Sequence, residues 1–248
     1  MSDAVPPLRR LAFGDLDGVA WGVAWIPNPT LPGFVAVGSG EEAVIVEASL
    51  EPDDESGGWH LHGYGVELNV SAAGEEAQDL RGDFETVCRV HGGVTIEAVE
   101  HDVDCLGLLG VHAGTGDLDK FDSARDVSAW FDPTHGLSVA ALRPRKSRGQ
   151  ESDIVSAVAL EPEGALAIDD PRLSTTYAGD GRPLRVGLEL WVAAGDDEEE
   201  QFPRRATGET FGVPAAGRLG HFDVLAQFVR WDSRYGDGAG VYLLAQQA

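Results

Sequence analysis

Lysine and long apolar runs are both scarce in this sequence. Only Lys120 and Lys146 are lysine, and the 18 basic residues are outnumbered by 42 acidic ones, for a formal net charge of −24 at pH 7. A field of that sign repels nucleic acid and anionic membranes, so we expect neither as a partner. No apolar run approaches the roughly 20 residues that span a bilayer, and no basic segment followed by an apolar one opens the sequence. We therefore expect a cytoplasmic protein without a membrane span.

Cysteine is also rare. Cys88 and Cys105 fit no zinc-binding spacing, and both lie in apolar, strand-like runs. In a cytoplasmic chain this favours two buried free thiols over a disulfide. The Gly-x-Ser-x-Gly nucleophile motif and the glycine-rich phosphate loop are both absent from the sequence.

Short strand-like segments recur along the whole chain, separated by glycine, proline and acidic turns. Examples are residues 19–26, 43–50 and 183–192, and no long amphipathic helix interrupts them. This pattern predicts an all-β, antiparallel fold of two barrels or barrel/sandwich halves. A boundary near the middle gives halves 1–118 and 119–248, which could also form one continuous unit.

Two further segments give more specific expectations. Residues 84–91 and 94–101 flank Gly92-Gly93, which predicts a hairpin that turns at the two glycines. Residues 59–70 are predicted to form one long strand.

The densest cluster of polar and aromatic side chains lies in the middle of the chain. If residues 124–131 form a strand, Asp126, Ser128 and Trp130 share one face, and Arg125 lies on the other. An acid, a hydroxyl and an indole turned into one cavity would orient a small ligand. The alternative is a bent strand whose Arg-Asp pair only ties a corner.

This central segment resembles a known family. Residues 124–130 read Ala-Arg-Asp-Val-Ser-Ala-Trp and are similar to the Arg-Asp-His-Ser-Trp-Gly motif of the carotenoid hydratase (hydroxyneurosporene synthase) and AttH-like family. Residues 229–242 resemble that family's Arg-Trp-x-Gly-x-x-Gly-x-Gly ending. The resemblance covers about residues 120–245. It implies a pair of lipocalin-like barrels that act on apolar small molecules such as isoprenoids or polyketides, by hydration or cyclisation, without an organic cofactor.

The sequence also departs from the family motif. Val127 stands in place of the histidine, an alanine is inserted before Trp130, and Phe131 stands where glycine is expected. Arg125, Asp126, Ser128 and Trp130 carry over by position. Any acid role of the missing histidine is therefore in doubt.

A second polar group precedes the central segment. In one straight strand, His60, His62 and Tyr64 share a face that continues into apolar residues, whereas Glu67 lies on the other face. Imidazoles there could move protons, or bind a metal as in the first cupin motif, which this stretch resembles. The alternative is a pair of hydrogen-bonded histidines inside a barrel.

Together these patterns predict a cofactor-independent lyase, hydratase or isomerase with an apolar small-molecule ligand and no metal. Asp126 is the predicted acid or base, because burial would raise the pKa of its carboxyl group, and Arg125 is its predicted electrostatic partner. The predicted pocket-lining residues are Trp130, Ser128, His60, His62, Tyr64 and Trp231. The alternatives are a lipocalin-like carrier and a cupin-like metalloenzyme that uses His60 and His62. The oligomeric state stays open.

Overall fold

Antiparallel strands make up nearly all of the structure. The computed structural model describes residues 7–27, 32–54, 57–73, 77–78, 84–112, 117–147, 153–192 and 202–248. One turn of 3-10 helix, η1 (Leu118–Lys120), is the only helical element within these ranges. In the same ranges, no helix has the length and apolar character required to cross a membrane. The prediction of an all-β, antiparallel fold is confirmed.

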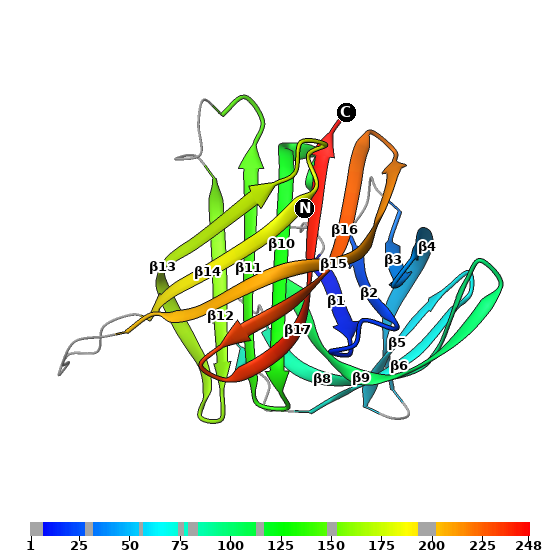
Figure 1. Cartoon of the computed structure of the whole chain (residues 1–248), viewed down its shortest axis with the longest axis horizontal. Helices are drawn as coiled ribbons and strands as arrows, with labels where there is room; N and C mark the ends of the chain where they lie inside the picture. The colour runs from blue at the N-terminus through cyan, green and yellow to red at the C-terminus, as the bar shows by residue number, and fades with distance from the viewer. Residues whose placement is uncertain are drawn as a thin grey trace, which may run out of the picture.

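The N-terminal half is a strongly curved sheet of nine strands (Figure 1). Their order is β6-β5-β4-β3-β2-β1-β9-β8-β7, and β6 also pairs with β8, which makes the sheet a nearly closed barrel. The strands are β1 (Leu8–Gly14), β2 (Trp21–Ile26), β3 (Phe34–Ser39), β4 (Glu42–Asp53), β5 (Gly58–Gly63), β6 (Val66–Ala72), β7 (Ala77–Gln78), β8 (Phe84–Ile96) and β9 (Val99–His112).

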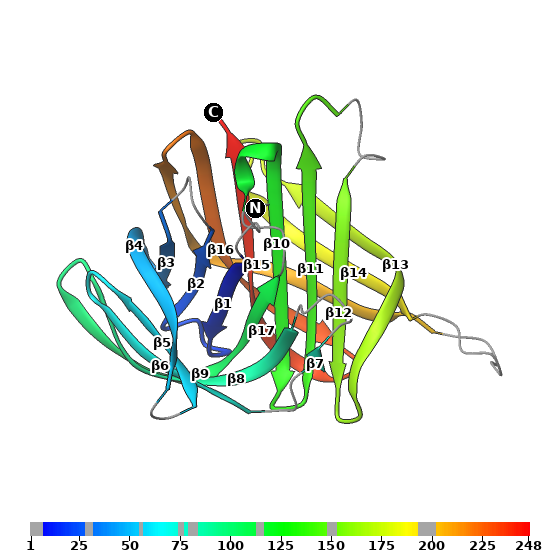
Figure 2. The ribbon, with the colours of Figure 1, turned by 180° about the vertical axis from the view of Figure 1, so that it is seen from behind.

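The C-terminal half is a closed barrel in which eight strands pair in sequence order and β17 returns to β10. Figure 2 shows these strands from behind, beside the curved N-terminal sheet. They are β10 (Phe121–Asp132), β11 (His135–Pro144), β12 (Ile154–Glu161), β13 (Gly164–Tyr177), β14 (Pro183–Val192), β15 (Arg204–Leu219), β16 (Phe222–Ser233) and β17 (Gly236–Gln247).

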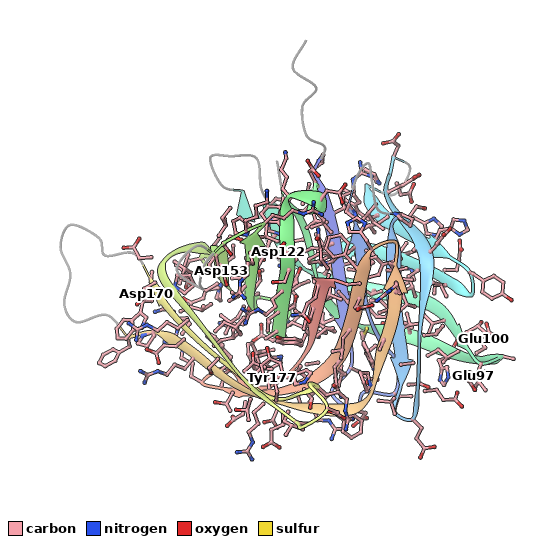
Figure 3. The ribbon with its side chains drawn as sticks, turned by 90° about the horizontal axis from the view of Figure 1, so that it is seen from above. Glu97, Glu100, Asp122, Asp153, Asp170 and Tyr177 are labelled. Atoms are coloured by element: carbon pink, nitrogen blue, oxygen red, sulfur yellow. The ribbon has the colours of Figure 1, made fainter. Side chains whose placement is uncertain are left out.

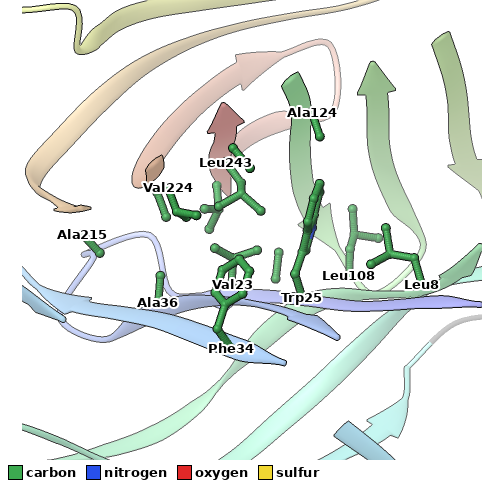
Figure 4. Close-up of a cluster of buried hydrophobic side chains, with 14 of the residues drawn as sticks. Leu8, Val23, Trp25, Phe34, Ala36, Leu108, Ala124, Ala215, Val224 and Leu243 are labelled. Carbon is green, nitrogen blue, oxygen red and sulfur yellow. The ribbon is translucent and has the colours of Figure 1, made fainter. Parts of the chain in front are cut away.

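The chain passes from the sheet to the barrel between His112 and Phe121, and no described strand pairs across the two halves. The halves nevertheless share one apolar cluster, to which Trp25, Leu108, Ala124 and Leu243 belong. In Figure 4 these side chains fill the space between the strands of the two halves. The division into domains 1–118 and 119–248 stays a prediction.

Two other clusters fill the barrels themselves. Leu61, Val90 and their neighbours form the interior of the N-terminal sheet, whereas Val127, Leu188 and their neighbours form the interior of the C-terminal barrel. Each strand at the junction therefore has one face in a barrel interior and the other toward the opposite half.

The prediction of one long strand over residues 59–70 is wrong. The chain reverses between Gly63 and Val66, where Gly65 has a φ of +70° that favours glycine, and β5 pairs with β6. The reversal brings Glu67 opposite His62, on the same face of the sheet.

The predicted turn at Gly92-Gly93 is also misplaced. Both glycines lie within β8, and the hairpin turns at Glu97-Ala98, where φ is 47° and 68°. A Cβ atom at Gly92 would lie 2.2 Å from the Glu67 carbonyl oxygen. The glycine therefore permits the close approach of β6 and β8 that rolls up the N-terminal sheet.

Candidate functional site

Five polar side chains are enclosed at the junction of the two halves. They come from five strands, β1, β8, β9, β10 and β11, and each is between 2% and 8% exposed. We call this group the junction cluster: Arg10, Glu85, His112, Asp126 and Ser138.

Strand alternation explains why charged side chains reach this position. In β1, Leu8 and Ala12 contribute to the shared apolar cluster, while Leu11 and Phe13 fill the N-terminal interior. Arg10 is in phase with Leu8 and Ala12 and therefore points toward the C-terminal barrel.

The same alternation places Asp126. In β10, Ala124 and Trp130 contribute to the shared cluster, whereas Val127 and Ala129 fill the C-terminal interior. Asp126 is in phase with Ala124 and Trp130, as predicted, and is buried. Strand β10 thus carries the acid to the junction rather than into the C-terminal barrel.

Arg10 is the centre of the junction cluster. Its Nη1 forms a buried ion pair with Asp126 Oδ1, and its Nη2 forms another with Glu85 Oε1. The Nη2 also donates to Ser138 Oγ at 2.6 Å, and Ser138 Oγ donates to Glu85 Oε1 at 2.9 Å. His112 Nε2 lies 3.0 Å from the same Glu85 oxygen.

Asp126 has further donors on both sides. The Trp25 indole Nε1 donates to Asp126 Oδ2 at 3.0 Å, and Ser128 Oγ donates to Oδ1 at 3.4 Å. With Arg10, these contacts reach both carboxylate oxygens, as a charged carboxylate in a dry environment requires.

The electrostatics of the cluster favour an ionised Glu85. Burial alone would raise the pKa of Glu85, but the Arg10 guanidinium and hydrogen bonds from His112 and Ser138 outweigh it and hold that pKa at about 2. Burial also works against the charge of Arg10, yet the two carboxylates raise its pKa above the ordinary value. The cluster can therefore keep a carboxylate charged inside the protein, where it can accept a proton or balance a positive charge.

The predicted pairing of Arg125 with Asp126 is wrong. Adjacent residues on a strand point to opposite faces, and Arg125 points toward the open end of the C-terminal barrel. Its ionic partner there is Asp153, with the Arg125 Nη2 3.7 Å from Oδ2. The partner of Asp126 is Arg10, which is 116 residues away in the sequence.

The expected inward position of His60, His62 and Tyr64 is also wrong. Leu61 fills the N-terminal interior, so the histidines on either side of it point outward. The side chain of His62 is 66% exposed, and Tyr64, in the turn, is 89% exposed. Both imidazoles lie near Glu67, at 2.8 Å from His60 and 3.4 Å from His62.

This outer position also bears on the cupin-like alternative. Within the described ranges, no group of three or more histidine, cysteine or acidic side chains is arranged to hold a metal ion. Both histidines lie on the outer face of β5, four strands along the sheet from Arg10 on β1, so the structure gives the metalloenzyme alternative no support.

The predicted aromatic and hydroxyl residues lie in two compartments. Trp130 and Ser128 face the junction, where the Trp130 Nε1 donates to the Gly14 carbonyl at 3.1 Å. Trp231 instead lies in the C-terminal barrel interior, and its buried Nε1 has no hydrogen-bond partner in the described part of the chain. Trp231 therefore cannot line a pocket together with Asp126.

Both cysteines are free, as predicted, but only Cys88 is fully buried and Cys105 is partly exposed. Burial raises the pKa of both thiols, that of Cys105 to about 12. Since the thiolate is the reactive form, neither cysteine is suited to act as a nucleophile near neutral pH.

Sequence reasoning missed Arg10, Glu85, His112 and Ser138. One weak signal was available: Arg10 and Glu85 lie in the largely apolar segments 8–13 and 84–90, which also contain Arg9 and Arg89. A charge in such a run is buried only with a partner. The sequence shows that a partner is needed but does not identify it.

The fold and the junction cluster define a class, a double-barrel β-protein with a polar group enclosed between its halves. No protein-family model matches the sequence, and no curated protein is significantly similar to it in sequence. The comparison with known proteins therefore rests on solved structures.

Several solved structures share this architecture over 98% of the chain. CghA with Sch210972 superposes with a TM-score of 0.60 at 11% identity, covering 89% of CghA. A putative AttH from Nitrosomonas europaea gives 0.60 at 10% identity and 93% coverage. Kievitone hydratase from Nectria haematococca gives 0.56 at 8% identity and 88% coverage. The chain thus shares the AttH-like double-barrel fold that its central motif predicts.

Proposed function

We propose that the protein is a cofactor-independent enzyme of the lyase, hydratase or isomerase type, acting on an apolar small molecule at the junction of its two halves. The observation that carries the proposal is a buried carboxylate, Asp126, which Arg10 holds in place among apolar and aromatic side chains. Because water is excluded from the junction, such a group can accept a proton directly from a substrate.

Asp126 is the proposed catalytic base, because it is the buried carboxylate that contacts the apolar and aromatic side chains of the junction. Arg10 and Trp25 are positioning residues that fix the two carboxylate oxygens. His112 is the most exposed member of the cluster and ends β9, so a substrate would approach from its side. The proton that Asp126 accepts is returned by Asp126 to another atom of the substrate, which balances an isomerisation.

The shared fold supports this reaction class. Among the similar structures, one is named a hydratase, and CghA contains a bound small molecule, Sch210972. The apolar lining of the junction, which includes Trp21, Trp25 and Trp130, suits an isoprenoid or polyketide, and aromatic faces there can stabilise a positive charge.

The proposal is tested by comparing the wild type with Asp126→Asn on a panel of isoprenoids and polyketides, with products followed by mass spectrometry. Loss of a general base should reduce turnover by about 100-fold or more. Equal turnover by the two proteins would remove Asp126 from the chemistry.

Two variants separate chemistry from structure. Glu85→Gln disturbs the same ion cluster without touching Asp126 and should reduce turnover by about tenfold or less. Asp223→Asn removes an exposed acid that pairs with Arg218 and should leave turnover unchanged. If Glu85→Gln and Asp126→Asn lose equal activity while still folded, Asp126 acts only through the cluster.

A non-catalytic carrier is the second candidate function. The described contacts of Asp126 are made within the protein, which also suits an ion pair that only ties the two halves together. Native mass spectrometry of protein purified from its own host distinguishes the candidates. A bound apolar molecule that incubation leaves unaltered favours the carrier, whereas its conversion favours the enzyme.

A further inference from the structure

The open end of the C-terminal barrel holds a cavity that the proposed reaction does not use. Its volume is about 410 Å³, and residues of β10, β11, β13 and β17 line it. Its polar lining residues are Ser123, Arg125, Arg143, Thr175, Tyr177 and Gln246. We call this space the mouth cavity.

The lining of the mouth cavity is mostly polar but includes two leucines. Leu173 and Leu244 line it, and both also pack against the cluster that fills the barrel interior. Val127, two residues after Arg125 on the same face of β10, belongs to that interior cluster. A ligand here would therefore meet mainly polar groups, with Leu173 and Leu244 as its apolar contacts.

Two arginines line the mouth cavity in a protein that is strongly negative overall, and Asp122 and Asp153 interact with Arg143. Arg143 forms a two-pronged ion pair with Asp153, with Nε and Nη2 at 2.9 and 3.0 Å from its two oxygens. The Arg125 Nη2 lies 3.7 Å from Asp153 Oδ2, and Arg125 makes no hydrogen bond within the described ranges. Asp153 thus neutralises Arg143, and the Arg125 guanidinium keeps donors free for an anion.

Hydroxyl groups occupy the opposite wall. The Tyr177 hydroxyl lies 3.0 Å from that of Tyr242, which also interacts with the buried Thr175 hydroxyl. Both lining residues belong to β13, three strands around the barrel from β10. Figure 3 shows Tyr177 and Asp153 in the C-terminal barrel, far from Glu97 and Glu100 at the other end of the molecule.

We propose that the mouth cavity binds a small carboxylic acid with an apolar body. Arg125 receives the carboxylate in a two-pronged pair, the Tyr177 hydroxyl donates a hydrogen bond to it, and the apolar body lies on Leu173 and Leu244. Asp153 pairs closely with Arg143, so only the Arg125 guanidinium is available to an anion. One guanidinium matches a singly charged carboxylate better than a doubly charged phosphate. Arg125 and Asp126 face different compartments, so this site is independent of the proposed reaction.

Calorimetry with octanoate tests the proposal, with octanol as its neutral counterpart and inorganic phosphate as a charged group without an apolar body. The folded wild type should bind octanoate in the millimolar range or tighter, octanol about tenfold more weakly, and phosphate not measurably. Failure to bind octanoate, or equal affinity for octanol, would overturn the proposal.

Three variants locate the site. Arg125→Gln should weaken octanoate binding by about tenfold, whereas Arg218→Gln, an exposed arginine paired with Asp223 on the barrel wall, should not change it. Asp153→Asn should strengthen binding, because it removes a repelling charge, which a merely structural role of Asp153 would not do. Unchanged affinity in Arg125→Gln would place any octanoate site elsewhere.

Discussion

Asp126 and Arg125 are neighbours in the chain, yet their surroundings have little in common. Asp126 is buried at the junction, with a guanidinium, an indole and a hydroxyl on its two oxygens. The Arg125 side chain is 19% exposed at the mouth cavity, with one carboxylate at 3.7 Å. One face of β10 is thus a closed ionic cluster, and the other is an open site with unused donors.

The comparison shows that the barrel wall, not sequence adjacency, decides what a charged residue does. A charge sealed between two halves must be matched by other charges, because an unmatched one is too costly to bury. A charge at a barrel opening remains hydrated and can stay available for a ligand. Stability should therefore depend on the junction cluster, and ligand binding on the mouth cavity.

The largest expected contrast is between the two arginines. Arg10→Ala leaves Asp126 and Glu85 buried without their cation and should lower the free energy of unfolding by about 3–5 kcal/mol. Arg125→Ala should lower it by about 1 kcal/mol or less. Urea unfolding of both variants measures the difference, and equal losses would contradict the contrast.

Acid should weaken the junction cluster specifically. The pKa of Glu85 is about 2 in the folded protein, below its ordinary value of 4.5. Its stabilising contribution is therefore complete above about pH 4.5 and is lost as the pH falls toward 2, by roughly 3 kcal/mol. Unfolding measured across this range should depend less on pH in Glu85→Gln, and an unchanged slope would argue against the assignment.

A smaller difference in stability is expected between substitutions of the two junction tryptophans, Trp25 and Trp130. Both Trp25→Phe and Trp130→Phe lose packing, but the Trp25 N–H binds a carboxylate, whereas the Trp130 N–H binds a backbone carbonyl. Hydrogen bonds to charged groups contribute about 1.5–3 kcal/mol, against about 0.5–1.5 for neutral ones. Thermal or urea unfolding should thus find Trp25→Phe less stable by about 1 kcal/mol, and the reverse order would count against the hydrogen bond from Trp25 to Asp126.

The smallest effect on stability is expected at the mouth cavity. Tyr177→Phe removes a half-exposed hydroxyl and its contact with Tyr242, which should cost about 1 kcal/mol or less. The same change should weaken octanoate binding several-fold in calorimetry, because it removes a donor from the proposed site. A large loss of stability with unchanged binding would reverse the assigned roles.

Local pattern was sufficient for much of the fold. Alternation over residues 124–131 correctly predicted which β10 side chains face together, because it depends only on strand geometry. It failed at residues 59–70, where alternation continues on both sides of the Gly63–Val66 reversal and hides the turn. It also missed the turn at Glu97-Ala98, since neither residue is glycine or asparagine, the usual residues at positive φ.

The candidate site was less accessible to sequence reasoning. Asp126 could be predicted as a buried acid, but its partner Arg10 is 116 residues away, and Glu85 is 75 residues from Arg10. Such a pairing depends on how the two halves pack, and no local periodicity encodes it. Arg125 was assigned to Asp126 because it is adjacent in sequence, although strand geometry separates the two.

A pair of double-mutant cycles, measured by urea unfolding, tests the account most directly. One cycle combines Arg10→Ala with Asp126→Ala, and the other combines Arg125→Ala with Asp126→Ala. We expect a coupling energy of about 2 kcal/mol or more for Arg10 and Asp126, and below about 0.5 kcal/mol for Arg125 and Asp126. Strong coupling of Asp126 to Arg125, with little or none to Arg10, would contradict the separation of the two compartments.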